Sequence, residues 1–330
     1  MAKSKSGKAV PAGKKRRKKA RYIDYDYEEL YNQSVENWDE WFIKQALADG
    51  KIKSVYATKE VYAGDQLEIE IYPEFTKQQA TAEGITPVKK AKRQQTQRLL
   101  NSKNSRKQFW RLAEHNFTNS DYWITLTYAG NQPTLEEAQK CIQRYLRNIN
   151  GKRKRRGFPN AKYLYVTETV SEEGETVRAH HHLFLSGDCL TLDELNDMWK
   201  YGRRNQLRRI EKDEDGIRGA ASYMVKEKQD TKRKKYKKRW NGSASLEKPP
   251  EKKHHQTKPK TVNRMVKERD YIRRYVEAQK RYTGYIYSGA EIYFNEWNAR
   301  YYVRVRMRKG QKPDEQEESG AGKQKAVHGG

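Results

Sequence analysis

Three consecutive histidines stand at positions 180–182 and lead directly into the apolar run 183–185. Side chains two residues apart on a β-strand share a face, so His180 and His182 are expected to converge, while His181 points away with the leucines. An earlier predicted strand ends near Glu168 and supplies a carboxylate. Two imidazoles and a carboxylate suit a divalent cation. His180, His182 and Glu168 are therefore the candidate metal ligands.

Two further blocks flank the histidines. Residues 123–128 form an apolar predicted strand upstream, and residues 217–226 form a predicted helix downstream, with Tyr223 one turn before Lys226. This order resembles the HUH endonuclease superfamily, and within it the rolling-circle replication initiators of bacterial plasmids and phages. The superfamily usually has a bulky apolar residue between its two histidines, a position that His181 occupies here. The resemblance covers roughly residues 95–230.

The resemblance implies a metal-dependent DNA endonuclease and strand transferase. Tyr223 matches the family's nucleophile, which attacks phosphorus and forms a covalent 5′-phosphotyrosine link that conserves the phosphodiester energy for rejoining. A tyrosine hydroxyl has a pKa of about 10 in water, so Lys226 is expected to stabilise the phenolate or to hold the scissile phosphate. The expected ion, held by His180, His182 and Glu168, is Mg²⁺ or Mn²⁺, and imidazole ligands favour Mn²⁺.

Glu227 stands where two-tyrosine initiators place a second nucleophile, so the chain resembles a one-tyrosine enzyme. The preferred interpretation is an initiator that nicks single-stranded origin DNA and rejoins it, with a host helicase and polymerase as partners. A single-strand transposase of the same superfamily is one alternative, and a non-catalytic basic nucleic-acid-binding protein is another. No Gly-x-x-x-x-Gly-Lys-Ser/Thr phosphate loop is present, which disfavours an intrinsic helicase.

The composition predicts a polyanionic partner. The 330 residues carry a formal net charge of +27, and neutralising DNA phosphates with lysine and arginine releases counterions and gives sequence-independent affinity. No apolar stretch approaches the roughly 20 residues of a membrane-spanning helix, and no signal peptide is evident. We expect no membrane partner and a cytoplasmic protein in a bacterial host, or a nuclear one in a eukaryotic host. The cysteines, Cys141 and Cys189, cannot make a disulfide framework.

Three dense basic runs are the candidate contacts to single-stranded and duplex origin DNA: an N-terminal run, a predicted loop at 152–156, and a run in a predicted linker. Clustered like charges repel each other and stay solvated, where they can meet phosphates. The candidate DNA-binding residues are Lys14, Lys15, Arg16, Arg17, Lys152, Arg153, Lys154, Arg155, Arg156, Lys232, Arg233, Lys234 and Lys235.

The pattern of elements predicts an α+β protein. Two capping boxes, Thr134 to Glu137 and Thr191 to Glu194, begin amphipathic helices between predicted strands. The family resemblance adds a central antiparallel sheet that carries the histidine strand, with helices packed on one face. The expected divisions are a disordered basic arm (1–21), a small unit with a β-hairpin (22–87), the endonuclease domain (88–230), a basic linker (231–260), a helix-plus-hairpin unit (261–308) and a disordered tail (309–330).

Overall fold

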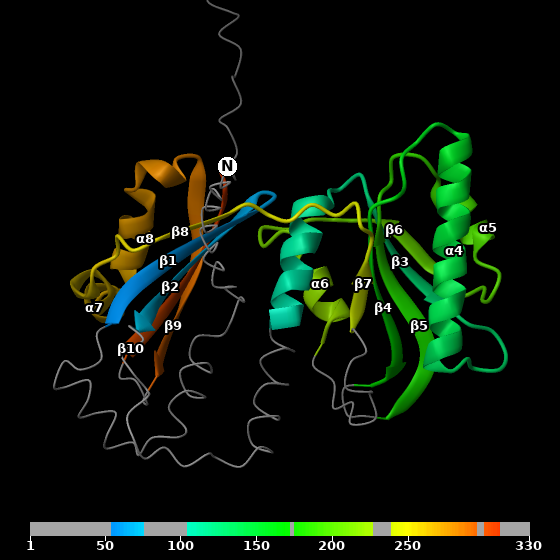
Figure 1. Ribbon diagram of the computed structural model, residues 1–330, viewed down its shortest axis with the longest axis horizontal. Helices are drawn as coiled ribbons and strands as arrows, with labels where there is room; N and C mark the ends of the chain where they lie inside the picture. Colours follow the sequence, from blue (N-terminus) through cyan, green and yellow to red (C-terminus); the bar gives the residue numbers. More distant parts are fainter. Residues whose placement is uncertain (1–53, 76–103, 172–174, 227–238, 296–299, 311–330) are drawn as a thin grey trace, which may run out of the picture.

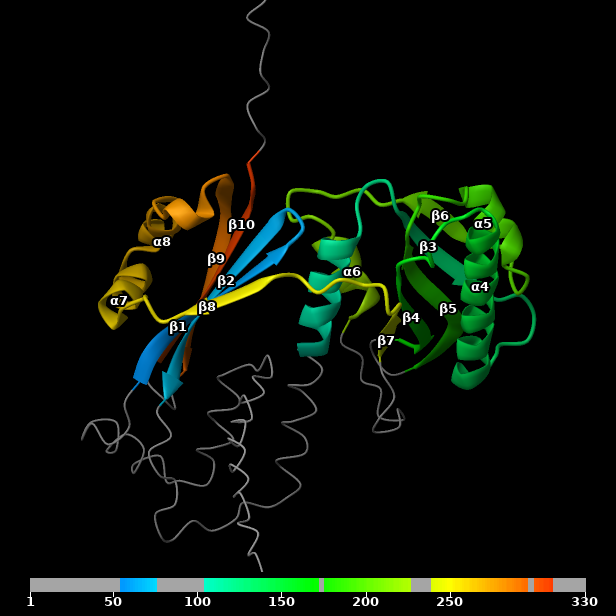
Figure 2. The same cartoon turned by 45° about the horizontal axis from the view of Figure 1, so that its top comes forward.

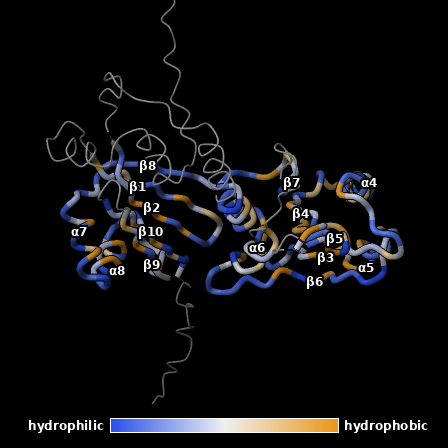
Figure 3. Tube along the Cα trace, turned by 90° about the horizontal axis from the view of Figure 1, so that it is seen from below, coloured by the Kyte–Doolittle hydropathy of each residue, from blue (hydrophilic) through white to orange (hydrophobic). Residues whose placement is uncertain are grey.

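The computed structural model describes residues 54–75, 104–171, 175–226, 239–295 and 300–310. Within these ranges the chain forms two five-stranded antiparallel sheets, each with its own helices, which confirms the α+β class (Figure 1). Apolar residues concentrate along the strands of both sheets, whereas the connecting segments are mainly hydrophilic (Figure 3). No helix in the described part of the chain is long and apolar enough to cross a bilayer.

The first sheet, here called the histidine sheet, has the strand order β6-β3-β5-β4-β7. Its strands are β3 (Tyr122–Thr127), β4 (Tyr163–Val170), β5 (Thr176–Leu185), β6 (Gln206–Arg209) and β7 (Trp240–Gly242). The histidine strand β5 lies at the centre, paired with β3 on one side and β4 on the other, as expected. A central strand is held by backbone hydrogen bonds along both edges, so the side chains of β5 are fixed relative to those of two neighbours.

Helices cover both faces of the histidine sheet, rather than the single face that we expected. On one face lie α4 (Leu135–Arg155) and α5 (Leu192–Met198), and both begin with the predicted capping boxes. The helix over residues 104–116 and α6 (Arg218–Met224) pack on the other face, against Phe184. The physical reason is that β5 carries apolar side chains on both sides of its pleat, Leu183 on one and Phe184 on the other, and each side must be buried.

The second sheet has the strand order β8-β1-β2-β10-β9. Its strands are β1 (Ser54–Ala63), β2 (Gln66–Phe75), β8 (Glu251–His254), β9 (Tyr285–Asn295) and β10 (Arg300–Lys309). Three helical segments pack on one face, α7 (Pro259–Lys267), α8 (Arg269–Glu277) and the 3-10 turn η1 (Lys280–Tyr282). The predicted alternation in β10 is confirmed, because Val303, Val305 and Met307 are buried on the helix side. The opposite face carries charged and aromatic side chains and looks toward the histidine sheet (Figure 1).

Pairing between distant segments changes the predicted organisation. The hairpin β1–β2 and the strands β9–β10 were expected in two separate units, but β2 pairs with β10 and joins them into one sheet. The expected linker 231–260 contributes β7 to the histidine sheet and β8 to the second sheet. One predicted helix, 262–280, is instead α7 and α8, separated at Glu268, whose φ of −123° and ψ of 91° are not helical. The basic arm lies outside the described residues.

A cluster of ions joins the two sheets through the helix 104–116, which lies between them in both views (Figures 1 and 2). The buried Arg111 binds Glu68 of β2, with Nε to Oε2 at 2.8 Å and Nη2 to Oε2 at 2.7 Å. Lys107 of the same helix and Arg304 of β10 contact Glu70. Burial raises the pKa of Glu70, but Lys107, Arg111 and Arg304 outweigh it and bring that pKa down to about 2. This contact between the two halves of the protein is therefore mainly ionic.

Candidate active site

The strand register places a carboxylate and two histidines on one surface. On β5, His180 lies opposite Glu168 of β4, and His182 lies two residues further along the same face. One possible ligand atom from each of the three residues lies within 4.8 Å of the others. The His180 Nε2 atom is 3.2 Å from Glu168 Oε2, and the centroids of the two imidazole rings are 5.0 Å apart. The sequence-predicted ligand set is thus assembled in space.

Hydrogen bonds orient both imidazoles so that their Nε2 atoms are the ones available as ligands. His180 Nδ1 donates to the carbonyl oxygen of Arg178 at 2.8 Å, and His182 Nδ1 lies 3.1 Å from the hydroxyl of Thr125. Metal-binding histidines commonly use their second nitrogen in this way, which fixes the ring and its tautomer. Two nitrogens and one carboxylate, with His180 and Glu168 part-exposed, leave room for phosphate and water. The residues present fit a divalent cation of the Mg²⁺ or Mn²⁺ type.

His181 lies on the opposite face, as strand alternation predicts. Its ring is fully buried, its Nε2 atom is 2.8 Å from the Tyr128 hydroxyl, and its Nδ1 atom is 3.0 Å from the Thr167 hydroxyl. The edge of Trp199 also packs on it, with ring centroids 5.6 Å apart. Burial, and then the two neighbouring histidines, lowers the pKa of His181 to about 3. The neutral His181 is therefore a hydrogen-bonded part of the core beneath α4.

Tyr223 stands on α6 above the histidine pair. Ala221 and Met224 bury the inner side of this helix, whereas the Tyr223 side chain is 48% exposed. Its ring centroid is 5.3 Å from that of His182 and 6.3 Å from that of Trp123, both edge-on. The ammonium of Lys226 lies 4.6 Å from the centre of the Tyr223 ring. The structure therefore brings the predicted nucleophile and the predicted lysine to the three candidate ligands.

Contacts with the helix 104–116 fix the start of α6. The Glu114 carboxylate accepts a hydrogen bond from the backbone N–H of Ile217 at 2.6 Å and pairs with Lys212 at 2.7 Å. Gly216 has a φ of 72°, and a Cβ atom there would lie 2.3 Å from Glu114 Oε2. Only glycine satisfies both the positive φ and the close approach. Tyr223 is thus carried by a helix whose start has little freedom to shift.

A groove of about 840 Å³ runs beside the tyrosine and the histidines, and sequence reasoning missed most of its cations. Arg208 of β6 stacks over Trp123 of β3, with its guanidinium carbon 4.2 Å from the ring centroid. The signal was the repeated pair of arginines on either side of a short edge strand, at 203–204 and 208–209. The cationic and aromatic groups that line the groove are Trp123, Tyr128, Arg178, His180, His182, Arg203, Arg204, Arg208 and Tyr223.

The basic run 152–156 is not the loop that we expected, because α4 continues to Arg155. Arg153 is only 2% exposed, and it donates to Asp188 Oδ2 at 3.0 Å and to the Pro159 carbonyl at 2.7 Å. A guanidinium that is buried and bonded in this way cannot contact DNA.

Lys152 and Arg156 both pair with Glu194 of α5, which leaves Lys154 and Arg155 as the exposed cations of this run. All five residues of the run belong to the end of α4, on the face opposite His180 and His182. The other candidates for DNA contact, Lys14 to Arg17 and Lys232 to Lys235, lie outside the described residues, as does Glu227. Their roles stay predictions.

A comparison with protein families matches residues 121–231 to a family described as replication-associated protein, of the ORF2 type. No curated protein and no solved structure matches the chain. The matched range runs from β3 to α6 and includes Glu168, the three histidines and Tyr223, and it leaves out the strands of the second sheet. The similarity of residues 121–231 to this family is consistent with a replication protein of the rolling-circle type.

Proposed function

We propose that this protein initiates rolling-circle replication by cutting a single DNA strand with Tyr223 and later rejoining it. One observation carries the proposal: an exposed tyrosine ring lies 5.3 Å from His182, beside Glu168 and His180, in a groove lined by arginines. The family match of residues 121–231 supports the same role. A purely structural histidine cluster would not require an exposed tyrosine and a basic groove on the same face.

The proposed reaction exchanges one phosphodiester for another. The Tyr223 hydroxyl oxygen forms a bond to phosphorus, the bond from phosphorus to the O3′ atom breaks, and the 5′-phosphate remains on the tyrosine. The phenolic proton leaves to solvent as O3′ takes up a proton and becomes a free hydroxyl. Rejoining is the reverse, in which O3′ attacks the phosphotyrosine and releases Tyr223. Because bond energy is conserved, no nucleotide cofactor is needed for sealing.

The surrounding residues are assigned by position. His180, His182 and Glu168 would hold Mg²⁺ or Mn²⁺, which supplies Lewis-acid polarisation of the scissile phosphate. Lys226, above the Tyr223 ring, stabilises negative charge on the phenolate or on the phosphate.

The exposed arginines 203, 204 and 208 bind backbone phosphates, and Trp123 offers a ring against which a base can stack. Contacts to the phosphate backbone position the strand without reading its sequence. These contacts hold the strand so that its scissile phosphate lies in line with the tyrosine oxygen.

The single tyrosine also shapes the proposed cycle. With Glu227 in place of a second nucleophile, termination would use a second subunit or an activated water. We propose single-stranded and duplex origin DNA as the substrate, a host helicase and polymerase as partners, and the cytoplasm of a bacterial host as the compartment. The absence of a phosphate-binding loop in the sequence supports an external helicase.

The test is a covalent adduct. The full chain is incubated with Mn²⁺ and a single-stranded oligonucleotide library with a randomised core, and protein–DNA species that resist denaturation are collected. The wild type and a Tyr201→Phe control should form the adduct, and mass spectrometry should place the nucleotide on the peptide that contains Tyr223. The Tyr223→Phe protein should keep its thermal stability and Mn²⁺ binding and form none. An adduct on another tyrosine, or none with the wild type, would refute the proposal.

A further inference from the structure

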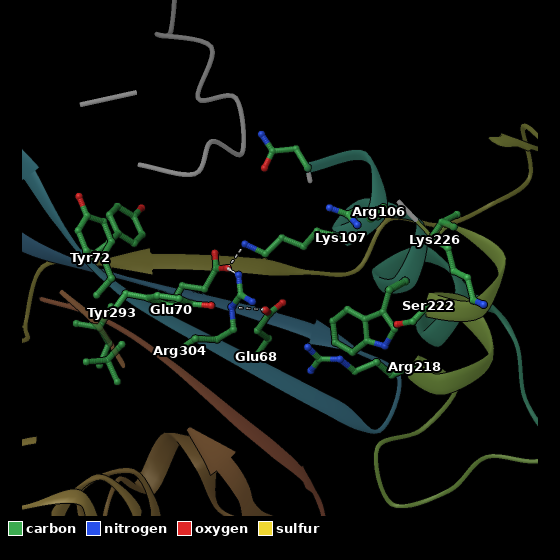
Figure 4. A pocket seen from close by; sticks show the side chains of 16 residues that line it. Glu68, Glu70, Tyr72, Arg106, Lys107, Arg218, Ser222, Lys226, Tyr293 and Arg304 are labelled. Carbon is green, nitrogen blue, oxygen red and sulfur yellow. Dashed lines mark ion pairs between the residues drawn. The ribbon is translucent and has the colours of Figure 1, made fainter. Parts of the chain in front are cut away.

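A second hollow, here called the cleft, lies between the second sheet and the helices 104–116 and α6 of the histidine sheet. Its volume is about 360 Å³. Figure 4 shows Tyr72 and Tyr293 at one end and Arg218, Ser222 and Lys226 at the other. The polar and aromatic groups that line it are Glu68, Glu70, Tyr72, Asn104, Arg106, Lys107, Trp110, Arg218, Ser222, Lys226, Tyr293, Tyr302 and Arg304. Apart from Arg218, Ser222 and Lys226, these side chains lie outside the range of the family match.

Cations outweigh carboxylates in the cleft. Both of its carboxylates are already engaged, since Glu68 binds Arg111 from beneath and Glu70 pairs with Lys107 and Arg304. The guanidinium of Arg218 lies 5.4 Å from the centre of the Trp110 ring. Burial, and then the nearby charge of Arg306, lowers the pKa of Arg218 below its ordinary value. A partly desolvated guanidinium beside another cation is stabilised by an anion, and its planar fork matches two oxygens of a phosphate.

The cleft and the groove meet at α6. Tyr223 lines the groove, whereas its neighbours Ser222 and Lys226 line the cleft. The Lys226 ammonium reaches back over the Tyr223 ring at 4.6 Å. A phosphate attacked by Tyr223 therefore lies where the two hollows adjoin, and a chain of nucleotides can continue from it in both directions.

We propose that the cleft binds the stretch of single-stranded DNA adjacent to the phosphate that Tyr223 attacks. The inference rests on the proposed function, because that function makes Tyr223 the point of cleavage. Arg106, Arg218 and Lys226 contact successive phosphates, and the tyrosines of β2, β9 and β10 stack against unpaired bases. Cationic side chains interleaved with aromatic rings are the chemistry by which proteins hold an unpaired strand, whose base faces are open.

Strand alternation provides a matched pair of variants. Tyr293 and Phe294 are neighbours on β9 and are 47% and 48% exposed, respectively. Tyr293 pairs with Tyr302 on the cleft side, whereas Phe294 pairs with Tyr301 and packs on its ring on the other side. Truncating either residue removes an equally exposed ring from the same strand, and only one of the two rings faces the cleft.

The experiment measures binding without cleavage. The full chain carrying Tyr223→Phe is titrated against fluorescent oligothymidylate at fixed salt with Mn²⁺, and anisotropy gives Kd. Tyr293→Ala should weaken binding at least about fivefold, the lower end of what one stacked base contributes, and Phe294→Ala should leave it unchanged. A charge-matched pair tests the phosphate contacts: Arg106→Glu should weaken binding much more than Arg273→Glu, which changes an exposed arginine of α8 by the same charge.

Equal effects within both pairs would overturn the proposal, because binding would then follow total charge or general destabilisation. If Tyr293→Ala lowers the melting temperature, the two arginine variants decide. Photo-crosslinking with 5-iodouracil in the strand gives an independent readout, with products expected on the peptides of β2, β9 and β10. Since every variant carries Tyr223→Phe, this result does not depend on whether the wild type forms an adduct. Loss of the adduct would refute the proposed cleavage, and loss of the cleft contacts would refute only this inference.

Discussion

Replacing the three histidines one at a time by alanine should separate metal binding from stability. His180 and His182 belong to the candidate metal cluster, whereas His181 belongs to the core on the other face of β5. The three residues are adjacent in sequence and chemically identical, so any difference in behaviour must come from the faces that they occupy. We expect His180→Ala to lose metal and keep its fold, and His181→Ala to show the reverse.

The structure gives the magnitudes. His181 has two buried hydrogen bonds, to Tyr128 and to Thr167, each worth about 0.5–1.5 kcal/mol. Removing its fully buried ring adds a cavity cost of roughly 1–2 kcal/mol, so His181→Ala should lower the free energy of unfolding by about 2–5 kcal/mol. His180 is part-exposed and donates one hydrogen bond to a backbone carbonyl, so His180→Ala should cost about 1 kcal/mol.

The metal affinity should show the opposite order. Loss of a group that only hydrogen-bonds to a metal ligand changes metal affinity about 10–100-fold, so deleting a ligand itself in His180→Ala or His182→Ala should weaken Mn²⁺ binding by more than about tenfold. Free Mn²⁺ measured by electron paramagnetic resonance gives this affinity, and urea unfolding in the presence of a chelator gives stability. If folded His181→Ala lost Mn²⁺ affinity as severely as His180→Ala, or if His182→Ala bound like the wild type, the assignment of faces to functions would be wrong.

Three further outcomes are expected. Arg111→Met should lower the unfolding free energy by about 3 kcal/mol, because it leaves the buried Glu68 with Arg304 as its remaining cation, and adding Glu68→Gln should restore much of the loss. The folded pKa of Glu70, about 2, is below the ordinary 4.5, so its stabilisation is full above pH 4.5 and is lost as the pH falls toward 2; the difference between wild type and Glu70→Gln should shrink over that window, and a constant difference would contradict it. Duplex affinity should fall steeply from about 50 to 200 mM salt, with a slope reduced by about 0.9 in Lys154→Gln if that residue meets a phosphate and unchanged in Arg153→Gln, and a flat salt profile would remove the role of the basic runs.

Local rules were sufficient for the elements and for the faces of single strands. The capping boxes at Thr134 and Thr191 begin real helices, and alternation along β5 separates His181 from its neighbours. Alternation along β10 likewise puts the valines inward and the arginines outward. These properties depend on a few neighbouring residues and on the fixed periods of helices and strands, so the sequence by itself determined them.

Partners across long sequence separations were decided by the tertiary structure. Arg153 looked like one of five solvated cations, but Asp188 and the Pro159 carbonyl bury it. The groove arginines became part of the site only because β6 pairs with β3. The second sheet, and with it the cleft, exists because β2 pairs with β10 across most of the chain. Backbone pairing offers the same hydrogen bonds to any strand, so side-chain packing and charge over the whole fold select the partner, and no local pattern contains that choice.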